Sequence, residues 1–500
     1  MASLTLYPSE ERLSGGERTI FNLYLVTALL AFLALMVVGL AMRMTQAAWL
    51  DLPKNTFFQY LSLHGAGMVG TMVMVTTAVM WFFLRKYVRL HLWAFVANYV
   101  FFLAGVLCVV TGVAQGYLAL WTYLYPLPGL SMGSAGVVSA AWFMVGYLLL
   151  GVGQLIFYFD AAAGVIARYG NLGRAMGWQW LFAGEIDPDH PKAVVAGTGM
   201  IIANSLGILA GAVSLVMSLA NLFYPEIRID PLFTKTLIYW FGHMYINAAI
   251  YMGVIAIYEL LPRYSGKPYA ISRVFLWGWA ASTVLVIIVF PHHLLMDYAM
   301  PHWILAAGQM ASWGSGFPVV LVTTWGALAN IHHAGMRWSM PPRLMILALF
   351  GWVAGGFAAV LDSTIRVNLT MHNTLWVPGH FHFYLLVGVM AMILAMMYHW
   401  IGAQRTAAPA NTWADRIAFP VYLLGVAVFL YGFLDGGRHS AARRMATHWP
   451  EWVAYDRIAS IGAVIVIVSM GYFALRIIMG LLSTPASGAS GAPGPADTAG

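Results

Sequence analysis

The chain has 500 residues, of which 61% are hydrophobic and only 9% are charged. Soluble domains carry about 25% charged residues, so this composition excludes a soluble enzyme and predicts a protein built mostly of membrane-spanning segments. The single cysteine, Cys108, excludes an internal disulfide and a cluster held by several thiolates, and the formal charge of +7 indicates membrane orientation, with no nucleic-acid partner.

Twelve hydrophobic runs are long enough to cross a bilayer, which takes about 20 helical residues. In chain order they cover residues 19–42, 57–84, 93–120, 135–160, 193–222, 233–261, 271–295, 302–330, 341–366, 375–402, 413–435 and 456–482. We therefore expect an all-α integral membrane fold, with residues 1–483 forming one domain in the lipid bilayer. Residues 484–500 are rich in alanine, glycine, serine and proline, which predicts a disordered tail.

Lysine and arginine are distributed unevenly around these segments. With the N-terminus in the cytoplasm, sixteen of the 25 basic residues lie on the cytoplasmic side and the other nine lie outside. Cytoplasmic loops of membrane proteins carry the excess of positive charge. The sequence therefore predicts a multi-pass protein of the bacterial inner (plasma) membrane, with both termini in the cytoplasm.

Six histidines lie inside the predicted spans. They are His64 in the second span, His243 in the sixth, His292 and His293 in the seventh, and His380 and His382 in the tenth. At about 1.5 Å per helical residue, all six lie within about 15 Å of the periplasmic surface. A hydrogen bond to a carbonyl or a water cavity explains one such imidazole equally well, but six at one depth predict a ligand-binding site.

The pair His380 and His382 predicts two large ligands rather than one small one. Successive helical residues turn by about 100°, so residues two apart point to opposite faces of the helix. Neutral imidazole binds iron well. His64 and His382, on separate helices, could hold a six-coordinate heme, and His380 could be the only protein ligand of a second heme with one open face.

A three-histidine metal site is predicted beside these hemes. His243, His292 and His293 offer three neutral nitrogens and leave one metal position open. No acid lies at the same depth, because Glu259 is more than four helical turns from His243 and Asp297 lies at the outer boundary. Three nitrogens without a carboxylate favour copper, with non-heme iron as the alternative. An open heme iron facing such a metal suits the reduction of a small diatomic molecule.

Four segments carry a resemblance to a known family, namely residues 61–65, 240–243, 291–293 and 372–382. Their sequences resemble subunit I of the heme–copper oxidase superfamily, and the last one is similar to its B-type branch. The resemblance covers nearly the whole chain except its two termini.

The resemblance assigns roles to the histidines and to a basic pair. It implies a low-spin heme on His64 and His382, a high-spin heme on His380, and copper on the three remaining histidines of the spans. It also implies that Arg443 and Arg444 bind heme propionates, with His372 near them. The two hemes would be of b type, with a type as the alternative. The other eight histidines are expected near helix ends or in loops and receive no ligand role.

One position departs from the oxidase pattern. In A-type and B-type oxidases a tyrosine follows the first copper histidine by four residues and is covalently joined to a copper histidine. Here that position is Asn247, which a helix places over His243. Reduction of O₂ takes four electrons, and the tyrosine supplies the fourth. Reduction of two NO molecules to N₂O and water takes two electrons and two protons and needs no such side chain.

The predicted activity is therefore that of a respiratory nitric oxide reductase, with Asn247 and His380 as the catalytic residues. The alternative is a terminal cytochrome oxidase that reduces O₂ to water. A third hypothesis, a transporter or heme-delivery protein, is less favoured. Transporter sites lie near the membrane midplane, whereas these histidines lie near one surface.

The family's cytoplasmic proton path also looks reduced. B-type oxidases carry a row of hydroxyl side chains that leads protons from the cytoplasm. Of the matching positions here, only Tyr258 has a hydroxyl. The others are Val254, Val319, Val322 and Trp325. Asn368 replaces an acid found four residues before the position that His372 matches. An enzyme that takes its protons from the periplasmic side would not need this row of hydroxyls.

The sequence contains no cupredoxin domain and no CxxCH heme-attachment motif. We therefore expect a second subunit with a periplasmic cupredoxin-like or cytochrome electron-entry domain. A soluble cytochrome c or copper protein would be the electron donor, and the active site would lie toward the periplasmic side.

Overall fold

The computed structural model describes residues 6, 12–121, 123–127, 136–405 and 411–482. This part of the chain is almost entirely helical, and its only β-type pairing is an isolated bridge between Thr374 and Ala442. The α-helices are α1 (Gly15–Gln46), α2 (Lys54–Leu84), α3 (Leu92–Ala114), α4 (Gly136–Tyr169), α5 (Leu172–Ala175), α6 (Lys192–Phe223), α7 (Pro231–Ser265), α8 (Arg273–Ile288), α9 (His302–Ser315), α10 (Phe317–Ile331), α11 (Met340–Asp362), α12 (Ile365–Met371), α13 (Trp376–Phe383), α14 (Met390–Arg405), α15 (Trp413–Arg438) and α16 (Val453–Leu482).

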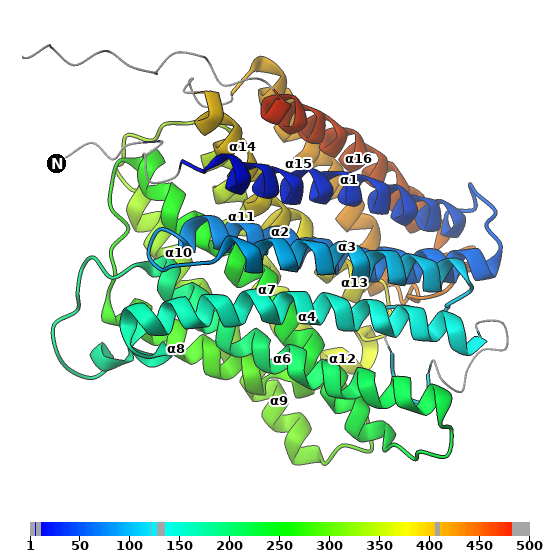
Figure 1. Ribbon diagram of the computed structural model, residues 1–500. Helices are drawn as coiled ribbons and strands as arrows, with labels where there is room; N and C mark the ends of the chain where they lie inside the picture. Colours follow the sequence, from blue (N-terminus) through cyan, green and yellow to red (C-terminus); the bar gives the residue numbers. More distant parts are fainter. Residues whose placement is uncertain (1–5, 7–11, 122, 128–135, 406–410, 483–500) are drawn as a thin grey trace, which may run out of the picture.

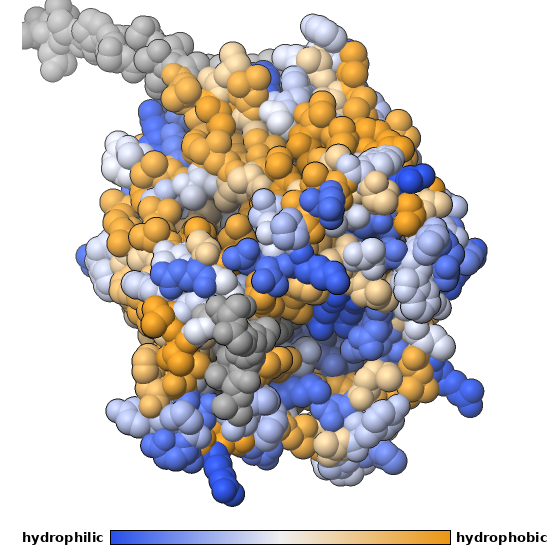
Figure 2. All heavy atoms as spheres, turned by 90° about the vertical axis from the view of Figure 1, so that its right-hand side faces the viewer, coloured by the Kyte–Doolittle hydropathy of each residue, from blue (hydrophilic) through white to orange (hydrophobic). Residues whose placement is uncertain are grey.

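The predicted all-α membrane fold is confirmed. Twelve segments of the described chain are long and apolar enough to cross a membrane, and they coincide with the twelve predicted runs. The long helices run side by side along one direction (Figure 1). Figure 2 shows the end of this bundle at which α1 finishes, where hydrophilic side chains gather across the middle of the face. The predicted tail at 484–500 lies outside the described residues.

Local sequence signals set the helix ends. Ser14 and Glu17 form a capping box at the start of α1, and Thr412 and Asp415 form another at the start of α15. Each box satisfies backbone N–H groups that have no partner within the helix. α7 begins after Asp230, whose side chain accepts a hydrogen bond from the N–H of Leu232.

Three of the four spans that carry the predicted ligands are the most buried of the described bundle, and the fourth, from α8 to η3, is 56% buried. The most hydrophobic window is 89% buried in α2, 78% buried in α7 and 72% buried in the segment from α13 to α14. The span formed by α9 and α10 is only 22% buried. The candidate site is therefore enclosed by the bundle core.

Two of the ligand-bearing segments are not regular α-helix. The α8 helix gives way to a 3₁₀ segment, η3 (Phe290–Leu294), and α13 continues into a π-helical turn, η4 (Tyr384–Val389). Single π-helical turns occur frequently at functional sites. Here the turn follows directly after the two histidines of α13.

Candidate functional site

One cavity of about 670 Å³ connects all the ligand, propionate-binding and catalytic residues predicted from the sequence. Its walls include His64, His243, Asn247, His292, His293, His372, His380, His382, Arg443 and Arg444. These residues come from α2, α7, η3, α13 and the segments outside the membrane-spanning helices. Sequence reasoning thus identified a group that the fold gathers around a single internal space.

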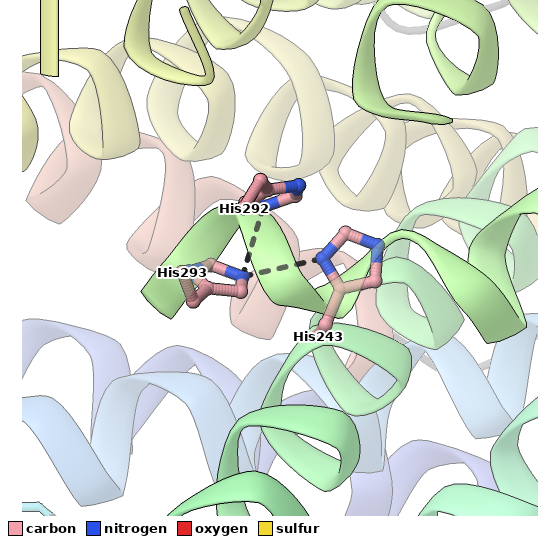
Figure 3. A group of neighbouring side chains, drawn as sticks. All are labelled: His243, His292 and His293. Carbon is pink, nitrogen blue, oxygen red and sulfur yellow. Dashed lines mark hydrogen bonds between the residues drawn. The ribbon is translucent and has the colours of Figure 1, made fainter. Parts of the chain in front are cut away.

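Three histidines, one from α7 and two from η3, converge on one point (Figure 3). Nδ1 of His243 lies 3.3 Å from Nε2 of His293, which lies 3.1 Å from Nε2 of His292. One ligand atom from each ring lies within 4.8 Å of the others. Nitrogens bound to one tetrahedral metal at about 2.0–2.1 Å are separated by about 3.3 Å. The three rings therefore fit a single metal ion.

Asn247 lies against His243 on the same helix. Its side-chain nitrogen donates to the carbonyl of His243 at 2.8 Å and lies 3.2 Å from Nε2 of that residue. His243 consequently turns Nδ1 toward His293 and Nε2 toward the amide. The ring of Tyr245, two residues earlier, packs on Phe241 at 5.1 Å instead. The helical placement expected for Asn247 is confirmed.

His64 and His382 face each other across the cavity. Their ring centres are 6.2 Å apart and their planes differ by 24°. Nδ1 of His64 hydrogen-bonds the carbonyl of Leu35 at 2.8 Å, and Nδ1 of His382 hydrogen-bonds that of Pro378 at 2.7 Å. Two metal–imidazole bonds of about 2 Å each, plus the ring radii, span about 6 Å. The pair therefore fits a heme iron held from both sides, with each ligand oriented by a carbonyl.

His380 lines the same cavity but is held differently. Its Nδ1 atom is buried and has no hydrogen-bond partner among the described residues. Its ring lies 6.1 Å from that of Tyr384, one turn further along the chain. One buried imidazole without a facing histidine suits a heme iron with an open coordination position.

The outer wall of the cavity is basic. The N–H of Arg443 donates to the carbonyl of Asn373 at 2.9 Å, which holds the segment around Arg443 against the one that follows His372. Burial, and then the neighbouring Arg443 and Arg444, lower the pKa of His372 to about 4. Burial and then Arg444 lower the pKa of Arg443 to about 10. The Nε atom of Arg443 is buried without a partner among the described residues, so this wall fits an anionic group such as a heme propionate.

Asp362 is a cavity residue that the sequence reasoning missed. Its carboxylate accepts a hydrogen bond from the indole nitrogen of Trp376 at 2.5 Å and lines the cavity with His372 and Arg443. The carboxylates considered from the sequence were Glu259 and Asp297, and Asn368 stands where the resemblance implies an acid. A lone carboxylate at the end of a hydrophobic run is a functional candidate by itself, and that signal could have found Asp362.

A second hydroxyl, outside the matched positions, lies beside Tyr258. The hydroxyl of Thr323, on α10, lies 2.5 Å from that of Tyr258, and the indole nitrogen of Trp279 donates to the same phenol at 3.1 Å. Val322, the position matched from the sequence, directly precedes Thr323 on α10.

Comparison with known proteins agrees with this geometry. A family model described as "Cytochrome C and Quinol oxidase polypeptide I" matches residues 19–465. A cytochrome c oxidase polypeptide 1 of Halobacterium salinarum is 26% identical over 249 residues, which cover 48% of this chain and 40% of the relative. A cytochrome c oxidase subunit 1 of Candida albicans is 23% identical over 392 residues, covering 76% of this chain and 69% of the relative.

The fold also matches a solved structure. The chain superposes on a heme-copper terminal oxidase, solved as a dimer by cryo-electron microscopy, with a TM-score of 0.73 and 18% identity. The match covers 95% of this chain and 85% of the other. The alignments to the first three curated relatives span only 40%, 49% and 51% of those proteins' own length.

Proposed function

The chain belongs to the cytochrome c and quinol oxidase polypeptide I family, and we propose that within this family it is a membrane nitric oxide reductase. Two NO, two electrons and two protons give N₂O and water. We assign the low-spin heme to His64 and His382 and the high-spin heme to His380.

The three-histidine group would hold copper, with non-heme iron as the alternative. Among the described residues, the potential metal group contains His243, His292 and His293 and no carboxylate. Neutral nitrogens alone favour copper over a hard oxygen-seeking ion. When bound, this metal and the high-spin heme would supply two redox centres facing one gas pocket.

Asn247 is the single observation that carries the choice of substrate. Its amide occupies the helical turn over His243, where the resemblance leads us to expect a redox-active phenol. An amide donates and accepts hydrogen bonds but supplies no electron. A two-electron reaction needs only the two metal centres, so Asn247 is compatible with NO reduction, whereas the four-electron reaction would take its fourth electron from another group.

The remaining cavity residues would bind the hemes, orient their histidine ligands and balance the charge of the propionates. Arg443 and Arg444 would pair with heme propionates. The carbonyls of Leu35 and Pro378 orient the rings of the low-spin pair. Asp362, beside Arg443, can hold or release a proton at the outer wall of the cavity.

O₂ reduction is the second candidate, favoured by two other phenols. Tyr251 and Tyr384 line the same cavity as Asn247. Tyr251 follows Asn247 by one helical turn, and Tyr384 follows His380 by one turn. Either phenol could supply a fourth electron. The oxidase names of the curated relatives also favour this reaction.

Turnover of the two gases distinguishes the candidates. Purified wild-type enzyme given a chemical reductant should consume NO, with release of N₂O, at least tenfold faster than it consumes O₂. Asn247→Tyr should lower NO turnover, because the bulkier ring fills the gas pocket. Tyr245→Phe is the matched control on the same helix and should leave both rates unchanged. Faster consumption of O₂ than of NO by the wild type would overturn the proposal.

Electron entry is assigned to a second subunit in the same membrane. Its periplasmic cupredoxin-like or cytochrome domain would accept electrons from a soluble cytochrome c or copper protein. We place the cavity toward the periplasmic side and both termini in the cytoplasm. Co-purification of such a subunit with the active enzyme tests this assignment.

A further inference from the structure

A buried ion pair lies next to the two facing histidines. The guanidinium of Arg43, near the end of α1, donates to one oxygen of Asp456 at 2.6 Å, and both side chains are buried. The other oxygen of Asp456, in the first turn of α16, lies 2.7 Å from Nδ1 of His448. Gln46 lies 3.2 Å from Nε2 of the same ring. One carboxylate thus joins α1, α16 and the segment between α15 and α16.

Stability alone is a weak explanation for this arrangement. Removing two charges from water is costly, and replacing a buried ion pair with apolar side chains is often neutral or stabilising. Most other buried positions of α1 are apolar, so an apolar pair would fit the pattern of the helix. The charges at Arg43 and Asp456 therefore call for another role, and their neighbours indicate which one.

Arg43 is close to one ligand of the proposed low-spin heme. Its guanidinium carbon lies 4.3 Å from the ring centre of Phe433, which lies 5.3 Å from the ring centre of His382. The guanidinium carbon of Arg43 therefore lies no further from the ring centre of His382 than the sum of these two distances. Arg43 also lines the cavity together with His64 and His382.

We propose that Asp456, held by His448, sets the reduction potential of the heme between His64 and His382 by offsetting the charge of Arg43. The inference rests on the proposed low-spin heme and is independent of which gas is reduced. One-electron reduction adds negative charge to the heme, so Arg43 favours the reduced form and Asp456 opposes it. A unit charge about 10 Å away, at an effective dielectric constant of about 20, changes the equilibrium constant by roughly tenfold.

Asp456 thus acts by its charge beside Arg43, His448 holds it in place, and the effect of the Asp456 charge is measurable without turnover. Spectroelectrochemical titration of the purified holoenzyme reports the midpoint potential of each heme. Asp456→Asn removes the negative charge and should raise the midpoint of the low-spin heme by about 59 mV, the one-electron equivalent of a tenfold change. The high-spin heme should shift less.

Three further variants test the predicted direction of the shift in the low-spin midpoint potential. Arg43→Gln leaves the negative charge of Asp456 and should lower the low-spin midpoint. The double variant Arg43→Gln/Asp456→Asn removes both charges and should return the midpoint close to the wild-type value. His448→Gln keeps a hydrogen-bond donor for Asp456 and should leave the midpoint nearly unchanged. If Asp456→Asn cannot be purified, the double variant is compared with Arg43→Gln, and its low-spin midpoint should be the higher of the two.

A matched control uses another ion pair of the chain. Lys235 and Asp297 are paired at 2.6 Å beside η3, so Asp297→Asn should not move the low-spin midpoint. The inference is overturned by an unchanged or lowered midpoint in Asp456→Asn, or by equal shifts of both hemes. A wild-type spectrum without a bis-histidine heme overturns the proposed function and this inference with it, whereas an unshifted midpoint overturns the inference alone.

Discussion

Gly39 is the residue at which α1 makes room for His64. A Cβ atom at position 39 would lie 2.7 Å from Cε1 and 2.9 Å from Nδ1 of the His64 ring, whose Nδ1 is held by the carbonyl of Leu35. Gly39→Ala should therefore push the ring away from His382. We predict that the low-spin heme content falls to less than half while the high-spin heme is retained, measured by pyridine hemochrome and by the bis-histidine EPR signal.

The control for this substitution is Gly471→Ala on α16, away from the cavity, where an added Cβ meets nothing within 4 Å. It should keep both hemes. Equal heme contents in the two variants would show that the backbone approach at Gly39 does not fix the position of the His64 ring.

Residues within one motif were predictable, and residues joined across the fold were not. The face of a helix follows from spacing, so His243 and Asn247 could be placed together from sequence. The pairing of Arg43 with Asp456 joins positions 413 residues apart, and no local pattern indicates it. His448 was accordingly assigned to a loop with no role, although its side chain is buried beside that carboxylate.

At the scale of elements, hydrophobic length predicted every span but not the breaks within them. The 3₁₀ segment η3 contains Pro291, a local signal for a break that hydrophobic length alone does not register. The π-helical turn η4 keeps the apolar composition of ordinary helix, so composition does not distinguish it, and it depends on tertiary packing. An added Cβ at Gly351 of α11 would lie 2.6 Å from the backbone nitrogen of Gly388, inside η4. The close approach of α11 to η4 therefore depends on how the chain folds and cannot be predicted from the local sequence.

The segment between α4 and α6 is expected to depend on pH through His190. The ring lies edge-on to Tyr169 at 5.4 Å and to Trp180 at 5.0 Å, and its Nε2 hydrogen-bonds the carbonyl of Ala175 at 2.8 Å. Burial lowers the pKa of His190 below the ordinary value of 6.5. Below pH 6.5 the unfolded segment takes up a proton that the folded segment resists, so its stability is full above this pH and falls as the pH drops.

Limited trypsin digestion checks this prediction. Cleavage in the segment should be several-fold faster at pH 5.5 than at pH 7.5, after division by the rate for His190→Gln at the same pH. The glutamine keeps a donor for the Ala175 carbonyl but does not titrate. A ratio that stays constant between the two pH values would contradict a role for His190.

At the scale of the whole molecule, the bundle holds the two proposed metal centres on different supports. The low-spin pair is oriented by carbonyls of α1 and α13, whereas the three-histidine group depends on α7 and η3. His292→Ala should therefore reduce copper from one ion per chain to nearly none, because two nitrogens remain, while the heme content stays unchanged. Elemental analysis beside pyridine hemochrome measures both. A loss of heme in parallel with copper would mean that the two centres fold as one unit, and that the metal is needed to close the cavity around the hemes.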